Sequence, residues 1–180
     1  MWIVAVLCVL LLVASTLVHY ETLRIMSYAL PRLPMPPRIK MVVVILGAFA
    51  GHMLEVLMYT LAYQWMLWEH GLGTIGESGK PSFLTSLYFS ASTYTSLGYG
   101  DVVPTGPLTL LASSEALLGL LLIGWTAAYL FISMERFWED DAGHPAQGTA
   151  ATTRNALDER PAPSTAPQAA RRRAGRGAHR

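Results

Sequence analysis

Three long apolar runs divide the chain, at residues 1–18, 41–68 and 107–134. The first has no charged side chain, the second is interrupted by one histidine, His52, and one carboxylate, Glu55, and the only charged side chain of the third is Glu115. A helix needs about 17–25 apolar residues to cross the hydrocarbon core of a bilayer. The pattern therefore predicts three membrane-spanning helices.

The run at 1–18 lies near the lower limit for a span, and a cleaved signal peptide is the alternative. No Lys or Arg precedes it, and residues 14–16 form only a poor cleavage site, which favours a retained anchor. The next stretch, 19–40, is polar and contains four prolines: Pro31, Pro34, Pro36 and Pro37. Because proline breaks a continuous helix, this stretch is predicted to be a linker.

A shorter apolar stretch lies between the second and third runs. Residues 82–94 (SFLTSLYFSASTY) follow a Gly-rich loop and precede the irregular segment 95–101 (TSLGYGD). As a helix, 82–94 would be only about 20 Å long, too short to cross a bilayer. It is therefore predicted to enter the membrane and return, or to be buried in protein.

Irregular backbone at membrane depth is tolerated only where it is buried in protein or lines a water-filled cavity. Gly98 and Gly100 permit backbone angles closed to other residues, which allows successive carbonyl groups to point the same way. Rings of such carbonyls can replace the water shell of an ion. The segment is therefore a candidate ion pathway.

The sequence of 95–101 resembles the signature of potassium channels, whose selectivity filter is usually Thr-Val-Gly-Tyr-Gly. The wider pattern at 41–138 is similar to the two-transmembrane pore module: outer helix 41–68, pore helix 82–94, filter 95–101 and inner helix 107–134. The resemblance implies an all-α membrane protein that forms a tetrameric pore, here preceded by an extra transmembrane helix.

The same resemblance implies that K⁺ binds the carbonyl oxygens of Ser96, Leu97, Gly98 and Tyr99 and the Ser96 hydroxyl. The ion-binding stretch then comprises Thr95, Ser96, Leu97, Gly98, Tyr99 and Gly100. Ser96 and Leu97 stand where the family usually has Thr and Val. A less selective monovalent cation channel is therefore an alternative, and a regulatory channel subunit is another.

Three residues are expected to support the filter: Asp101, Tyr88 and Ser92. The resemblance suggests that Asp101 bonds behind the filter, although an exposed carboxylate that attracts cations is the simpler interpretation. Tyr99 is expected to pack against Tyr88 and Phe89.

His52, Glu55 and Glu115 are candidates for a functional polar network, since ionisable groups at bilayer depth are costly. Helix rise places Glu55 and Glu115 at similar depths, near Ser92 and Thr93, so the two carboxyl groups are expected to meet with one protonated. The alternative is that each bonds a neighbouring helix separately and only aids packing.

The sequence argues against a metal site at His52 and Glu55. No other histidine falls in a predicted span, so the number of ligands is too small. Gly119 and Gly124 in the inner helix are interpreted either as a gating hinge or as small residues that permit close packing.

Composition narrows the functional classes. The chain is 52% hydrophobic and 14% charged and has one cysteine, which argues against a soluble domain and excludes an intrachain disulfide. No helix has arginine at every third position, as a voltage sensor would. An intramembrane enzyme is also disfavoured, because the chain has no nucleophile at a suitable spacing from His52, Glu55 and Glu115. The prediction is thus a non-enzyme that needs no cofactor, with K⁺ as the permeant ligand.

Charge predicts the orientation. Of the 13 Lys and Arg residues, only Lys80 falls between the second and third runs. The positive-inside rule therefore places the N-terminus outside and the C-terminus in the cytoplasm of a cell membrane. Residues 139–180 are predicted to be a disordered basic tail, whose arginines either contact anionic lipids or are merely solvated. The chain is predicted to assemble with copies of itself into a homotetramer in the bilayer and to bind no nucleic acid.

Overall fold

The computed structural model describes residues 2–69, 71, 73–76 and 81–142. These residues belong to the unit Met1–Asp141, apart from Ala142, and the predicted tail lies outside the described residues from position 143 onward. The helices are α1 (Trp2–Ala29), a short 3₁₀ helix (Leu30–Arg32), α2 (Pro37–Glu69), α3 (Phe83–Tyr94) and α4 (Leu108–Ala142). Three of them are long and apolar enough to cross a membrane. The predicted all-α membrane fold is confirmed.

The first helix does not end at residue 18. It continues to Ala29, so the predicted linker 19–40 is wrong for residues 19–29. These residues are more polar than residues 1–18, but they include no proline or glycine, and polarity alone does not end a helix. The break occurs at the prolines: Pro31 lies in the 3₁₀ helix and Pro37 begins α2, where its fixed φ suits the first turn.

The other two long helices also extend past their predicted ends. α2 covers Pro37–Glu69 where 41–68 was expected, and α4 runs to Ala142 where the inner helix was expected to end at 134. Residues 135–142 contain neither glycine nor proline, so nothing in the local sequence stops α4 there. The short helix agrees with its prediction of 82–94 to within one residue.

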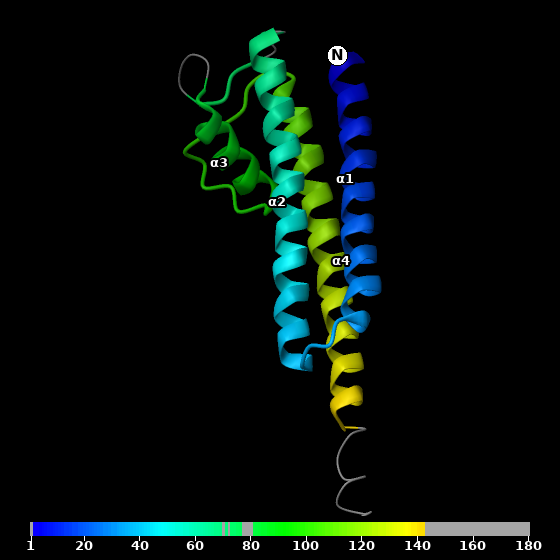
Figure 1. Cartoon of the computed structure of the whole chain (residues 1–180). Coiled ribbons are helices and arrows are strands. Elements are labelled where there is room, and N and C mark those ends of the chain that lie inside the picture. Colours follow the sequence, from blue (N-terminus) through cyan, green and yellow to red (C-terminus); the bar gives the residue numbers. More distant parts are fainter. Residues whose placement is uncertain (1, 70, 72, 77–80, 143–180) are drawn as a thin grey trace, which may run out of the picture. The chain divides into compact units, whose positions relative to one another are not determined.

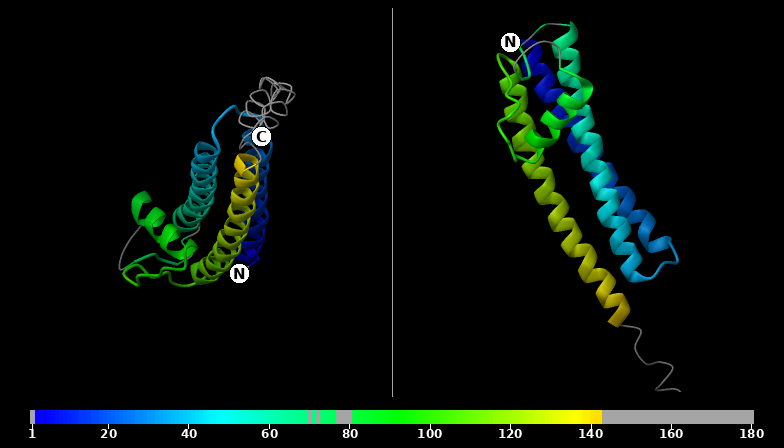
Figure 2. Two further views of the ribbon diagram at one scale, coloured as in Figure 1. Left: turned by 90° about the horizontal axis from the view of Figure 1, so that it is seen from below. Right: turned by 90° about the vertical axis from the view of Figure 1, so that its left-hand side faces the viewer.

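The long helices lie side by side, and the short helix α3 lies beside one half of α2 (Figure 1). α1 and α3 both pack against α2, and the two further views show them on different sides of it (Figure 2). Many large apolar side chains on α1, α2 and α4 are exposed in the single chain. Such surfaces are suited to lipid or to other copies of the chain.

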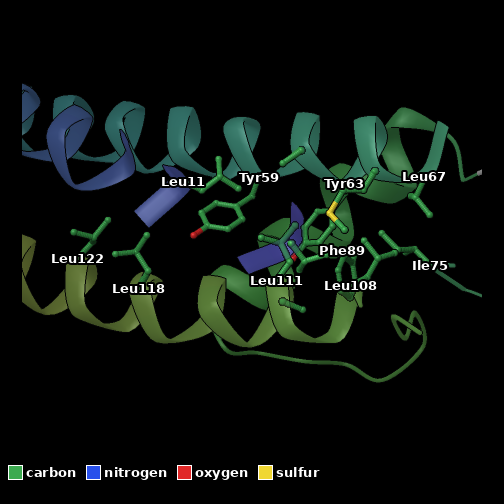
Figure 3. Close-up of a cluster of buried hydrophobic side chains, with 14 residues drawn as sticks. Leu11, Tyr59, Tyr63, Leu67, Ile75, Phe89, Leu108, Leu111, Leu118 and Leu122 are labelled. Carbon is green, nitrogen blue, oxygen red and sulfur yellow. The ribbon is translucent and has the colours of Figure 1, made fainter. Parts of the chain in front are cut away.

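One cluster of buried apolar side chains joins all four helices (Figure 3). Leu11 comes from α1, Tyr59 and Tyr63 from α2, Phe89 from α3 and Leu118 from α4. The Tyr63 and Phe89 rings meet edge to face with centroids 5.2 Å apart. Within a membrane, such packing holds helices together by van der Waals contact. The cluster therefore fixes α3 in its place between α2 and α4.

The start of α3 is defined by local bonds. Ser82 is its N-cap, and its hydroxyl accepts a hydrogen bond from the Thr85 amide at 3.1 Å. From α2, Gln64 Nε2 donates to the Ser86 hydroxyl at 2.8 Å. The chain after α3 is tied back as well, since the Thr105 amide donates to the Thr74 carbonyl at 2.9 Å. The start of α3 and the chain just before α4 are thus both held by hydrogen bonds.

Candidate functional site

The backbone of residues 95–101 alternates in handedness. Ser96, Gly98 and Gly100 have positive φ values of 56°, 51° and 81°, whereas Thr95 has a φ of −80°. Glycine adopts positive φ at little cost, but for serine the left-handed region is uncommon. Alternation of right- and left-handed residues turns successive peptide groups to the same side. The sequence predicted this freedom for the two glycines and did not predict it for Ser96.

The amides of this segment are bonded to the last turn of α3. The Thr95 amide donates to the Ala91 carbonyl at 3.2 Å, and the Ser96 amide to the Thr93 carbonyl at 2.9 Å. The Leu97 and Gly98 amides both donate to the Ser92 carbonyl, at 3.0 and 3.3 Å. Ser92 therefore supports the segment through its backbone oxygen. Among the described residues, none donates a hydrogen bond to the carbonyls of 95–100.

The far end of the segment is held by aromatic residues and a carboxylate. The Tyr88 and Tyr99 rings stack with centroids 6.2 Å apart and planes 10° apart. The Tyr88 hydroxyl donates to both Asp101 oxygens, at 3.1 and 2.9 Å. The Tyr88 side chain is exposed, and its partial desolvation, followed by the bond to Asp101, raises the pKa of its hydroxyl. Phe89 does not share this role as expected, because it packs into the core against Tyr63.

Glu55 lies at the centre of a buried polar cluster. His19 Nδ1 is 2.9 Å from Glu55 Oε1, and His52 Nδ1 is 3.3 Å from Glu55 Oε2. The Tyr94 hydroxyl donates to Glu55 Oε2 and lies 2.8 Å from His52 Nδ1. Thr126 Oγ1 completes the cluster, at 3.0 Å from His52 Nε2 and 3.2 Å from His19 Nε2.

This cluster overturns the reason for rejecting a metal site. The rejection assumed that no other histidine lies in a span, but His19 is buried in α1 and its ring centroid is 5.1 Å from that of His52. The spacing of residues along α1 is a signal in the sequence for this placement of His19. The buried residues Leu11, Ser15, His19 and Leu23 follow one another at intervals of four, as on one face of a helix.

Glu115 belongs to a different cluster. The Tyr63 hydroxyl donates to Glu115 Oε2 at 2.5 Å, and the Ser90 hydroxyl is 2.5 Å from Glu115 Oε1. The expectation that Glu55 and Glu115 meet beside Ser92 and Thr93 is therefore wrong. Each carboxyl group contacts a different side chain of α3, Tyr94 or Ser90, because the two approach α3 from different helices.

The hydrogen bonds around Glu115 can all be satisfied by an uncharged group. The Ser90 hydroxyl has one hydrogen but contacts both Glu115 Oε1 and the Val56 carbonyl, the latter at 2.9 Å. If Ser90 donates to Val56, the hydrogen in the other contact must come from Glu115. A neutral carboxylic acid, or an amide, provides it.

We therefore expect Glu115→Gln to fold with a stability close to that of the wild-type chain. Its amide supplies the same donor and acceptor. Glu115→Ala removes both and is expected to cost about 1–3 kcal/mol per polar partner left unsatisfied. The measurement is thermal unfolding of the purified protein in detergent. If the Gln variant is as unstable as the Ala variant, the uncharged interpretation is wrong.

The two glycines of α4 differ sharply in their surroundings. A Cβ atom at Gly119 would lie 2.0 Å from the carbonyl oxygen of Tyr94, whereas one at Gly124 would meet nothing within 4 Å. Gly119 therefore permits close packing of α4 under the end of α3. Close packing does not account for Gly124 in this structure.

Residues 39–136, which cover all but the first two residues of α2, all of α3 and most of α4, match a protein family described as ion channel. A stretch of 66 residues is 35% identical to the inward rectifier potassium channel Kirbac3.1 of Paramagnetospirillum magnetotacticum. This stretch covers 36% of the chain and 22% of that relative's length. No solved structure matches the chain.

Proposed function

The chain belongs to the ion channel family, and on this premise we propose that it is one subunit of a potassium-selective homotetrameric channel. The family consists of non-enzymatic channel proteins, and the three apolar helices identify an integral membrane protein. The proposed activity is passive conduction: partly dehydrated K⁺ ions pass in single file along rings of carbonyl oxygens. This activity needs no cofactor.

The observation that carries the proposal is the backbone of 95–100. Alternating φ at Ser96, Gly98 and Gly100 turns successive carbonyl groups to one side, and the amides of 95–98 are already bonded to α3. The carbonyl oxygens are thus left for another partner. Unpartnered carbonyls facing lipid would be too costly, so a cation in a protein-lined pathway is the partner that fits.

A single chain supplies only one wall of such a pathway. Residues 95–101 are exposed in the isolated chain, with Leu97 57% and Tyr99 67% accessible. One signature segment per chain means that a ring requires several copies related by a rotation axis. Four copies would be the number used by potassium channels, which this chain resembles.

Two observations favour a K⁺-selective channel over a less selective cation channel. One is the Gly-Tyr-Gly-Asp sequence at 98–101, and the other is the name of the relative, a potassium channel. Ser96 and Leu97 keep the backbone carbonyls of the family pattern. Their side chains change packing behind the carbonyls without adding charge. We therefore propose that both are tolerated variations within a selective filter.

The orientation proposed from charge places 95–101 near the outer surface and the C-terminus in the cytoplasm. On this view Arg24, Arg32, Arg38 and Lys40, at the α1–α2 end, share the cytoplasmic side with Arg136. Labelling of single cysteines placed near residue 73 and near residue 34, in sealed vesicles, would separate the two sides.

The test of the function is the reversal potential of the purified chain in planar bilayers, with K⁺ on one side and Na⁺ on the other. We expect reversal near the K⁺ equilibrium potential. Clear current with reversal near zero would instead identify a less selective cation channel. Absence of current from a stable tetramer would contradict conduction by this chain alone and indicate a regulatory subunit.

A further inference from the structure

Three potential metal ligands lie together inside the membrane-spanning part of the chain. His19 comes from α1, and His52 and Glu55 come from successive turns of α2. One donor atom of each lies within 4.8 Å of the other two. The His19 and Glu55 side chains are buried, and the side chain of His52 is 15% exposed.

We propose that His19, His52 and Glu55 bind a divalent transition metal ion of the zinc type. Two imidazole nitrogens and a carboxylate form a donor set well suited to zinc and cobalt and poorly suited to alkali metal ions. The K⁺ pathway proposed above uses only backbone carbonyls and one hydroxyl. The metal site is therefore chemically distinct from it and does not depend on it.

The distances between nitrogen and oxygen atoms in the cluster are close to those between ligands of one metal ion. Four donors placed about 2.0–2.1 Å from a tetrahedral zinc ion are separated by about 3.3 Å from one another. His19 Nδ1 lies 2.9 Å from Glu55 Oε1 and His52 Nδ1 lies 3.3 Å from Glu55 Oε2, and one donor atom of each residue lies within 4.8 Å of the other two. The Tyr94 hydroxyl, 2.8 Å from His52 Nδ1, is the group within reach of the fourth position.

Thr126 supplies the outer contact that such sites usually have. Metal-bound histidines donate the hydrogen on their other ring nitrogen to an oxygen acceptor. Here both Nε2 atoms face Thr126 Oγ1, at 3.0 and 3.2 Å. A hydroxyl oxygen has two lone pairs and can accept from both rings at once. Metal bound at the two Nδ1 atoms would thus leave every ring nitrogen satisfied.

Without a metal, two neutral rings that donate from Nδ1 to Glu55 and Tyr94 leave both Nε2 atoms as acceptors. The Thr126 hydroxyl has one hydrogen, so one Nε2 would remain unpaired. A purely hydrogen-bonded cluster avoids this only with an added proton. A metal-free cluster of that kind is the rival that the experiment must separate from the metal site.

A bound ion at this place would join three parts of the molecule. His19 belongs to α1, while His52 and Glu55 belong to α2. Tyr94 is the last residue of α3, directly before the segment at 95–101. The metal would therefore hold α1 against the pore module at the end of α3.

The experiment uses the full chain, purified in detergent with a tag that contains no histidine. Co²⁺ is added first, because tetrahedral Co²⁺ absorbs strongly in the visible range, and Zn²⁺ is then added as a competitor. We expect one Co²⁺ per chain, a visible band displaced by Zn²⁺, and a higher midpoint of thermal unfolding with Zn²⁺. A wild-type chain that shows no such band overturns the proposal in favour of the metal-free cluster.

Variants locate the site. His19→Asn is expected to lose the band, and Thr126→Val to keep it with about 10- to 100-fold weaker binding. The matched control replaces the three remaining histidines, His70, His144 and His179, with alanine and is expected to bind as wild type. A band that persists in His19→Asn, or disappears in the control, overturns the proposal. Because binding is measured without current, failure of the channel proposal would leave this result intact.

Discussion

The Gly119→Ala variant is expected to lose nearly all current, because α4 has no room for a methyl group at this position. The added Cβ would lie 2.0 Å from the Tyr94 carbonyl oxygen and 2.9 Å from its carbon. These are backbone atoms, so they cannot move aside as the tip of a side chain would. Overpacking of this kind costs about 1–3 kcal/mol or more. The strain falls on the residue that precedes the proposed filter.

Gly124→Ala is the matched control, since it makes the same change on the same helix where nothing lies within 4 Å. Alanine also has the higher helix propensity, by about 1 kcal/mol. We expect this variant to assemble and conduct. The measurements are the tetramer fraction by size exclusion in detergent and the current in bilayers. Normal current from Gly119→Ala would contradict the packing role, and loss of current in Gly124→Ala alone would indicate a hinge there.

The second large effect is expected from Gly98→Ala, which should abolish K⁺ selectivity. Gly98 has a φ of 51°, and the left-handed conformation costs an L-residue about 1–2 kcal/mol. An alanine relieves that strain by rotating its backbone, which turns a carbonyl away from the proposed pathway. Since selectivity depends on the complete set of carbonyl positions, the reversal potential should move toward zero or the current should vanish.

Gly71→Ala is the control for backbone strain, because it introduces the same strain outside the proposed filter. Gly71 has a φ of 58°, and an added Cβ meets nothing within 4 Å in the chain, as at Gly98. Both substitutions therefore carry a similar local cost. Equal thermal stability with selectivity lost only in Gly98→Ala is the expected outcome. A Gly98→Ala channel that remains K⁺-selective would contradict the carbonyl pathway.

Much of the fold could be predicted from local features. The short apolar stretch at 82–94 was bounded correctly, because Ser82 is a good N-cap and the following segment contains glycines where φ is positive. The spans were recognised from their apolar runs. Their ends were less accurate: hydrophobicity stops near residue 18, but the helix stops only at the first prolines.

The buried clusters were not predictable in the same way. Glu55 and Glu115 were placed at similar depths from helix rise, and both do contact α3. Depth alone does not say how a helix is rotated about its axis or which side chain it faces. Tyr63, Ser90 and Thr126 carry no sequence signature as partners of a carboxyl group or an imidazole. Their roles depend on how the helices are rotated relative to one another.

The sequence by itself determined the number of spanning helices, the short helix between the last two, and the signature segment at 95–101. These follow from residue hydrophobicity, capping and the backbone freedom of glycine, which act over a few neighbouring residues. Only the tertiary structure decided that His19 joins His52 and Glu55, that Glu115 bonds Tyr63 and Ser90 instead, and that Gly119 lies against Tyr94. Those contacts join residues far apart in the chain, and helix packing selects them.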